Sequence, residues 1–104
     1  MDFAPSERSR ALQEEVRRFL EEAVYPAEPL HHHQVATNRE EGNPYRTPAV
    51  VEHLKKQARE RGLWNLFLPD DEHGAGLSVL DYAPIAELSG RSFALAPEAM
   101  NCAA

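Results

Sequence analysis

The stretch from residue 62 to residue 78 constrains the fold more than any other part of this sequence. It opens with Gly62, which follows a basic segment of helical periodicity, and a glycine there can take the left-handed conformation that ends many helices. Residues 63–68 are mostly apolar, and a run of this length suits a short buried connector, with Trp64 and Phe67 expected in the core. Ser78 then suits the N-cap of a following helix. The stretch therefore predicts an apolar segment between two helices.

A first helix is predicted from about Ser6 to Val24, with Ser6 as its N-cap. The residue pair Tyr25–Pro26 is expected to end this helix, because a residue before proline is disfavoured in the helical region. The helix should bury one apolar face, and its opposite face carries charges at four-residue spacing, each pair contributing about 0.2–0.5 kcal/mol. The apolar positions are Leu12, Val16, Phe19, Leu20 and Ala23. The charged pairs are Arg10–Glu14, Glu14–Arg18, Arg17–Glu21 and Arg18–Glu22.

Between residues 26 and 47 the helical pattern fades, and Pro26, Pro29, Gly42 and Pro44 are expected to prevent a long element. Three adjacent histidines, residues 31–33, raise the question of a metal site. Adjacent side chains point in different directions on a helix or strand, and zinc ligands usually stand two to five residues apart. We therefore expect an exposed loop or helical turn, and no metal site.

Three further helices are predicted. One begins at Thr47–Pro48, with Thr47 as its cap and Pro48 at its first position, and buries Val51, Leu54 and Ala58. Its late basic residues suit a helix C-terminus better than a phosphate site. The next runs from Ser78 to about Ser89, with Asp81 completing a capping box, Pro84 bending it and Gly90 ending it. The last begins near residues 96–98 and shows no stop before residue 104, as expected of a piece of a longer chain.

Composition limits the classes of function. A chain of 104 residues is one domain at most, and its net charge of −6 disfavours a nucleic-acid binder. No apolar run reaches the roughly 20 residues that span a bilayer, and the N-terminus lacks the pattern of a secretory signal. The single cysteine, Cys102, cannot form a disulfide within the chain, which favours a reducing, cytoplasmic compartment. We expect its side chain to be an inert packing residue.

No nucleophile, base and orienting group stand at an interpretable spacing. The turn at residues 70–74 holds three carboxylates and a histidine, but it lacks the alternating ligands of a calcium loop. The sequence Gly74-Ala75-Gly76 is too short for a phosphate-binding loop. The residues alone therefore indicate a small, acidic, all-α helical bundle without a recognisable catalytic set.

The order of motifs resembles the N-terminal domain of the acyl-CoA dehydrogenases. In that family a helix ends in Gly-Leu, an apolar stretch ends in Pro, and a Gly-x-Gly turn leads into a helix carrying Glu-Leu. These motifs read Gly62-Leu63, Leu68-Pro69, Gly74-Ala75-Gly76 and Glu87-Leu88 here. The later residues 90–92, 96–98 and 101–104 resemble one branch of the family, and the resemblance covers nearly the whole of residues 1–104.

The resemblance implies a flavoprotein with a middle β-domain and a C-terminal helical domain, which together bind FAD. A glutamate base beyond residue 104 would remove the α-proton of an acyl-CoA, the β-hydrogen would pass to the flavin as hydride, and electrons would pass to an electron-transferring flavoprotein. The present domain would form one wall of the acyl pocket and would be inactive alone. Its candidate pocket-lining residues are Met100, Asn101, Ala103 and Ala104.

Two other interpretations stay open on the residues. The chain could be a stand-alone helical interaction module without catalysis, or, more remotely, a histidine-rich metal carrier. Because docking surfaces are often apolar, we also expect a homo-oligomer that associates through the last two helices.

Overall fold

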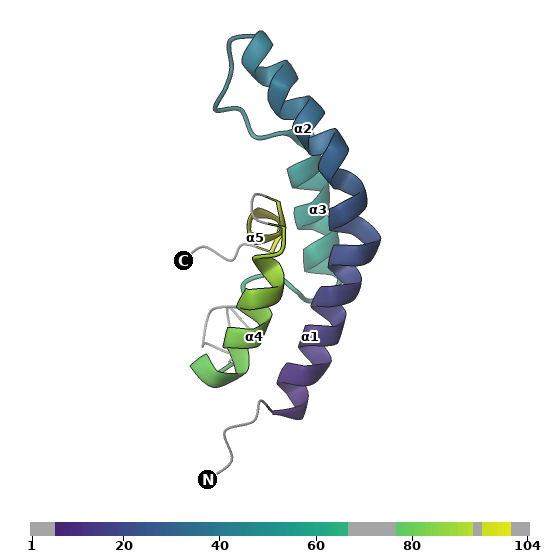
Figure 1. Cartoon of the computed structure of the whole chain (residues 1–104), viewed down its shortest axis with the longest axis vertical. Helices are drawn as coiled ribbons and strands as arrows, with labels where there is room; N and C mark the ends of the chain where they lie inside the picture. The colour runs from purple at the N-terminus through teal and green to yellow at the C-terminus, as the bar shows by residue number, and fades with distance from the viewer. Residues whose placement is uncertain (1–5, 67–76, 93–94, 101–104) are drawn as a thin grey trace.

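The computed structural model describes residues 6–66, 77–92 and 95–100. Within these ranges every regular element is helical, as predicted for an all-α bundle. Figure 1 shows α1, the π-helical turn η1 and α2 as one long rod, with α3, α4 and α5 along one side of it. The bounds are α1 Glu7–Phe19, η1 Leu20–Val24, α2 Tyr25–Glu40, α3 Ala49–Glu60, α4 Val79–Ser89 and α5 Ala96–Ala99.

The start of α1 and its buried face agree with the sequence. The Ser6 hydroxyl accepts a hydrogen bond of 3.1 Å from the Ser9 N–H, which makes Ser6 the N-cap. Val16, Phe19 and Leu20 are buried, and the remaining two positions of the apolar face pack partly against them. The apolar period of the sequence therefore correctly identifies the side of the rod that faces the core.

The charged face agrees with the sequence only in part. Arg18 and Glu14 approach to 3.7 Å, as predicted, and Arg17 pairs with Glu14 as well. Glu22, however, pairs with Arg61 of α3 at 3.1 Å. The prediction paired Glu22 with Arg18 by their spacing along one helix, and such a rule cannot predict a contact with a different helix.

The prediction that the first helix ends at Tyr25–Pro26 is wrong. At η1 the helix widens, and the Tyr25 N–H donates to the Leu20 carbonyl five residues back. A proline inside an α-helix lacks a donor and clashes with the carbonyl four residues before it. The wider turn stands directly before Pro26 and moves that carbonyl out of α-helical register, so the rod continues to Glu40 with Pro29 inside it.

The actual end of α2 uses a glycine that the sequence identified as a breaker. Gly42 has φ +80°, and the Asn43 N–H donates to the Asn38 carbonyl at 2.8 Å. This is the pattern of a helix that ends in a left-handed glycine. The break therefore lies at Gly42, and the three histidines of residues 31–33 lie on α2.

The start of α3 also differs from the prediction. Thr47 does not cap this helix, because Pro48 takes the cap position with an extended ψ of 140°. The Val50 N–H donates instead to the Gln34 side chain of α2 at 2.9 Å. A residue 16 positions earlier supplies the acceptor, which no local pattern predicts.

The end of α3 confirms the helix stop at Gly62. Gly62 has φ +74°, and the Leu63 N–H donates to the Ala58 carbonyl at 2.8 Å. Leu63 and Leu66 are buried, as expected of an apolar connector. Trp64 is only half-buried and lies outside the hydrophobic cluster, contrary to its predicted place in the core, and the Arg59 guanidinium lies 4.2 Å from its ring centroid. Phe67 and the glycine turn lie outside the described residues.

The N-termini of α1 and α4 are joined by hydrogen bonds. The Ser78 hydroxyl accepts from the Asp81 N–H at 3.2 Å, as predicted, but the Asp81 carboxylate accepts from the Ser6 N–H at 2.8 Å. The buried Ser9 hydroxyl donates to the Asp81 carbonyl. Asp81 therefore does not complete a simple capping box; it joins two helices. Pro84 lies inside α4, and Gly90 is its C-cap, as expected.

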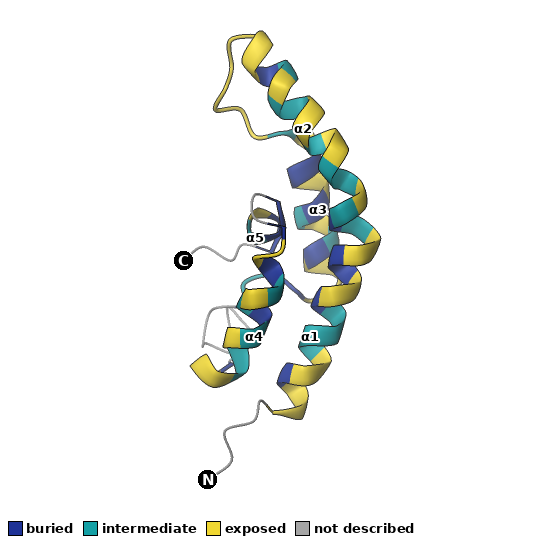
Figure 2. Ribbon diagram, in the orientation of Figure 1, coloured by how far each residue is buried: buried dark blue, intermediate teal, exposed yellow. Residues whose placement is uncertain are grey.

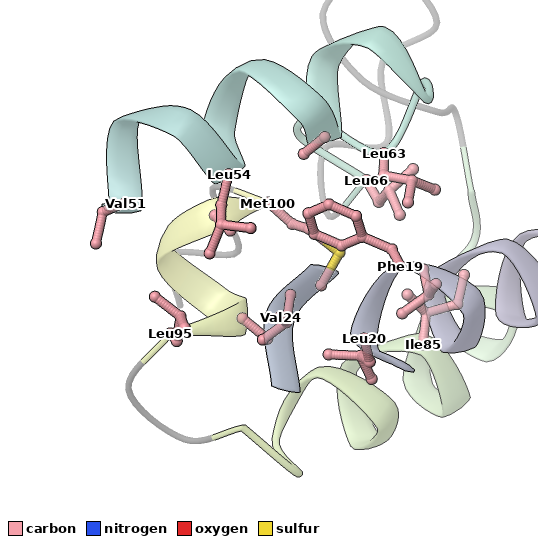
Figure 3. Packing of buried hydrophobic residues seen from close by; sticks show 14 of the residues in the cluster. Phe19, Leu20, Val24, Val51, Leu54, Leu63, Leu66, Ile85, Leu95 and Met100 are labelled. Atoms are coloured by element: carbon pink, nitrogen blue, oxygen red, sulfur yellow. The ribbon is translucent and has the colours of Figure 1, made fainter. Parts of the chain in front are cut away.

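One hydrophobic cluster holds these helices together, and it lies between the rod and the three helices beside it (Figure 2). Figure 3 shows Phe19 in the middle of this cluster, with residues from α3, α4 and α5 around it. The cluster consists of Val16, Phe19, Leu20, Val24, Val50, Val51, Leu54, Ala58, Leu63, Leu66, Leu77, Ile85, Leu95, Ala96, Ala99 and Met100.

We predict that Phe19→Ala lowers the free energy of unfolding by about 3–5 kcal/mol, because it leaves a cavity at the centre of the cluster. Val79→Ala is the control, since Val79 is 88% exposed and its truncation should change stability by no more than about 0.5 kcal/mol. Urea unfolding monitored by circular dichroism measures both. Equal, small effects would contradict the placement of Phe19.

Gly62 and Gly90 form a second matched pair. A Cβ at Gly62 meets nothing within 4 Å, so Gly62→Ala tests only the left-handed backbone and should cost about 1–2 kcal/mol. Gly90 has φ −65°, and its added Cβ would make an ordinary contact of 3.4 Å. Gly90→Ala should therefore be neutral or stabilise by up to about 1 kcal/mol. A thermal-unfolding scan that ranks the two variants in the reverse order would refute the helix stop at Gly62.

Candidate functional site

The candidate pocket wall begins at α5, which starts where the sequence predicts. Ala96, Ala99 and Met100 are buried, and the Met100 N–H donates to the Ala96 carbonyl at 3.1 Å. Met100 is the one predicted pocket-lining residue that the structure describes. Asn101, Ala103 and Ala104 lie outside the described residues, as does Cys102.

Met100 belongs to the hydrophobic cluster. Its side chain has no exposed surface in this chain, and Figure 3 draws it among Phe19, Val24 and Leu54. Methionine is flexible at three torsions and fills irregular apolar spaces. The position of Met100 therefore joins the core of the domain to the segment that follows it.

The beginning of α5 is fixed to the rod by a polar contact. The buried Ser92 hydroxyl donates to the Glu28 carboxylate of α2 at 2.8 Å, and the Ala96 N–H donates to the Ser92 carbonyl. A hydrogen bond to a charged acceptor is shorter and stronger than one between neutral groups. This contact holds Ser92, four residues before α5, against α2.

The end of α5 is fixed by the connector after α3. The Asn65 N–H donates to the Met100 carbonyl at 3.0 Å, and Asn65 has φ +59°. Sequence reasoning missed this contact. Asparagine tolerates the left-handed region better than most residues, so the polar residue in an apolar connector was the available signal.

Three open hollows lie along α2. The hollow nearest to α5 has about 280 Å³ and is lined by His31, residues 45–48, Val51 and Glu98. A second, of about 320 Å³, lies between the rod and α3, and a third, of about 380 Å³, lies beside the loop that precedes α3. Their linings mix charged and apolar side chains.

The three histidines do not converge on one point. His31 and His32 lie edge to face with ring centroids 6.0 Å apart, and His33 lines the hollow beside the loop that precedes α3. Among the described residues no group of three or more His, Cys, Asp or Glu side chains is arranged to hold a metal ion.

Three basic residues of α3 and its C-cap contact neighbouring side chains. Lys55 pairs with Glu52 at 3.4 Å, Arg59 covers Trp64, and Arg61 contacts both Glu22 and the Phe19 ring. These contacts favour the interpretation that the cluster stabilises the surface of the helix. Within the described part of the chain, no helix combines the length and the apolar character that a membrane span requires.

Comparisons with known proteins agree with this architecture. Residues 6–104 match the family described as "Acyl-CoA dehydrogenase, N-terminal domain". A Mycobacterium tuberculosis protein, named "Probable acyl-CoA dehydrogenase FadE2", is 41% identical over 106 residues, which is 100% of this chain and 24% of that protein. The rat protein "Acyl-CoA dehydrogenase family member 11" is 41% identical over 102 residues, 98% of this chain and 13% of its own length.

A solved structure agrees as well. A Mycobacterium abscessus protein assigned to the acyl-CoA dehydrogenases superposes with a TM-score of 0.82 and 43% identity, over 97% of this chain and 26% of that one. The chain belongs to the acyl-CoA dehydrogenase family and corresponds to its N-terminal domain. It spans about a quarter or less of the length of these relatives.

The pKa of His31 generates a prediction about pH. Burial, and then the neighbouring His32, lower the pKa of His31 below its ordinary value of 6.5, while Glu28 partly opposes the shift. The unfolded chain therefore binds this proton more readily than the folded one, so stability falls as the pH drops below about 6.5 and levels off below the folded pKa.

We expect His31→Asn to reduce this fall in stability, because it removes the imidazole that takes up the proton. His32→Asn should reduce the fall less, because His32 lowers the pKa of His31 less than burial does. Urea unfolding between about pH 5 and pH 8 compares the slopes of the three proteins. A slope in His31→Asn identical to that of the unaltered chain would contradict the assignment.

Proposed function

We propose that this chain is the N-terminal helical domain of an FAD-dependent acyl-CoA dehydrogenase, which forms one wall of the acyl pocket and is not active alone. The observation that carries the proposal is the match to the family over residues 6–104, together with an α5 fixed at both ends. A short helix that other elements hold at both ends can keep the residues after it in a defined position, as a pocket wall requires.

The proposed reaction is the α,β-dehydrogenation of an acyl-CoA thioester. When bound, the flavin would accept the β-hydrogen as hydride, while a base in the remainder of the enzyme would take the α-proton, which together would give an enoyl-CoA. The electrons would then pass to an electron-transferring flavoprotein. The part of this domain would be to exclude water and to shape the space for the acyl chain with Asn101, Ala103 and Ala104, while Met100, which is buried in the cluster, would join that segment to the core.

We propose that the flavin site lies outside the described residues. A dinucleotide pyrophosphate needs several convergent donors, typically at a helix N-terminus. The N-termini of α1, α3 and α4 are occupied by Ser6, Gln34 and Ser78 as acceptors. These contacts support the assignment of FAD to the middle and C-terminal domains, which the family resemblance implies. A cytoplasmic location and homo-oligomers remain predictions, the latter testable by light scattering.

The function is tested with the longer enzyme that we propose contains this domain. Purified with bound flavin and given an electron acceptor, it should convert a saturated acyl-CoA to a product lighter by two hydrogen atoms, seen by mass spectrometry. The isolated chain should form none. A flavin-loaded enzyme that forms no enoyl-CoA from short, medium, long or branched acyl-CoAs would overturn the proposal and favour an interaction module.

A separate experiment tests the proposal that FAD binds to the other domains and not to this one. After incubation of the isolated chain with excess FAD and desalting, the visible spectrum should show no flavin band, because the proposed site lies in other domains. Bovine serum albumin treated in the same way controls for carry-over. A stoichiometric flavin band would mean that this domain builds a flavin site itself.

A further inference from the structure

Tyr45 has the greatest exposure of the large apolar side chains in the described part of the chain. It is 99% exposed, against 88% for Val79 and less than half for Leu30 and Leu80. A tyrosine ring buries roughly 150–250 Å² when it is covered, and tyrosine is enriched at the centres of protein interfaces. Single exposed apolar residues are ordinary on a protein surface, so exposure alone assigns no role to Tyr45.

The backbone on both sides of Tyr45 is held in place. The Arg46 N–H donates to the Asn43 carbonyl at 3.1 Å, which closes a four-residue turn around Tyr45. The Arg46 carbonyl accepts from the Asn38 side chain at 3.1 Å, and Asn38 is only 8% exposed. The turn therefore presents the ring to solvent from a fixed position. An anchor that is already ordered loses little conformational entropy when it binds.

A hollow of about 280 Å³ lies beside Tyr45, and α5 forms part of its wall. Its lining residues are His31 of α2, residues 45–48, Val51 of α3 and Glu98 of α5. Figure 1 shows the loop before α3 and α5 on the same side of α2. Tyr45 therefore borders a recess into which another segment of protein can insert.

The part of the chain that carries Tyr45 projects beyond the hydrophobic cluster. α2 runs to Glu40, yet Asn38 is its only buried residue, and the cluster takes none of its buried residues from α2. Figure 2 shows the end of α2 and the loop before α3 as mostly exposed. The core of this domain therefore does not explain why the chain extends as far as Tyr45.

We infer that Tyr45 and the hollow beside it form a docking surface for the part of the longer enzyme that lies outside residues 1–104. The inference rests on the proposed function, since that function places this domain in a longer chain. This chain spans 24% of the Mycobacterium tuberculosis relative and 26% of the Mycobacterium abscessus one. Most of an enzyme of that length is therefore available to cover the surface.

Two observations favour the same polypeptide over a second copy of the domain. Glu98 borders the hollow and lies two residues before Met100, so a chain that continues from α5 starts next to this surface. A segment tethered at such a short distance has an effective concentration in roughly the millimolar range. A second copy would instead bring another net charge of −6 against the first.

Photo-crosslinking identifies what covers Tyr45. The longer, flavin-loaded enzyme carries the change Tyr45→p-benzoylphenylalanine and is irradiated and digested, and mass spectrometry identifies the crosslinked peptide. We expect a peptide outside residues 1–104, in a product that runs as a single chain on a denaturing gel. Glu21→p-benzoylphenylalanine is the matched control, because Glu21 is exposed on the charged face of the rod and lines none of the three hollows. It should give a far lower yield.

Nitration by tetranitromethane measures whether the ring is covered. An exposed tyrosine reacts at the rate of free N-acetyltyrosinamide, whereas a covered one reacts only when the contact opens. In the longer enzyme Tyr45 should react roughly tenfold or more slowly than the free amide. In the isolated 104-residue chain, where the ring is 99% exposed, it should react within about twofold of that amide.

The outcomes separate this inference from the proposed function. A crosslinked product of twice the mass, or protection of Tyr45 in the isolated chain that grows with concentration, would mean a second copy and overturn the inference. Equal yields from the Tyr45 and Glu21 positions, or nitration of the longer enzyme at the free rate, would overturn it as well. If that enzyme still forms enoyl-CoA, the proposed function stands. A covered Tyr45 in an enzyme that forms no enoyl-CoA would support the docking surface and overturn the proposed function.

Discussion

The burial of Phe19, Leu20 and Val24 along one side of the rod is the interaction on which the rest of the structure depends. These three residues span the end of α1 and the π-helical turn, and all are essentially without exposed surface. Each such side chain contributes about 1.5–3 kcal/mol when it leaves water. Residues from α3, α4 and α5 all pack against this stripe, so the three helices take their positions from it (Figure 3).

The π-helical turn extends the influence of this stripe to the proposed site. Because the rod continues past Pro26, α2 can present Glu28 to Ser92 and Gln34 to the first turn of α3. A helix that ended at Tyr25 would leave both contacts unmade. Turns of π-helix are rare and occur often where function requires a local change in helix register. Here the change in register admits a proline and places the acceptors for two other elements.

The sequence predicts most of the fold because most of it follows local rules. Ser6, Ser78 and Gly62 act as caps and stops through neighbouring backbone groups, and the apolar period of α1 and α3 identifies their buried faces. The failures share a cause. Pro26 and Thr47 were interpreted from their neighbours in the chain, whereas the deciding features are a widened turn and the side chain of Gln34.

The same distinction applies to the candidate site. The residue types of the last segment and its resemblance to the family pointed to Met100 as a pocket-lining residue. The structure buries Met100 in the cluster, and its place in a pocket stays a prediction. What the sequence did not predict are the contacts that fix α5, from Glu28 and Asn65. One bridges 64 residues, and the other joins the connector after α3 to the end of α5, so no spacing rule within an element reaches them.

A crystal structure of the longer enzyme with a bound acyl-CoA analogue would test the central claim most directly. The account predicts carbon atoms of the acyl chain within about 4 Å of side chains in the segment that begins at Met100, with the Asn65 N–H still on the Met100 carbonyl. An acyl chain that lies against other domains alone, with this segment packed wholly on protein, would contradict it.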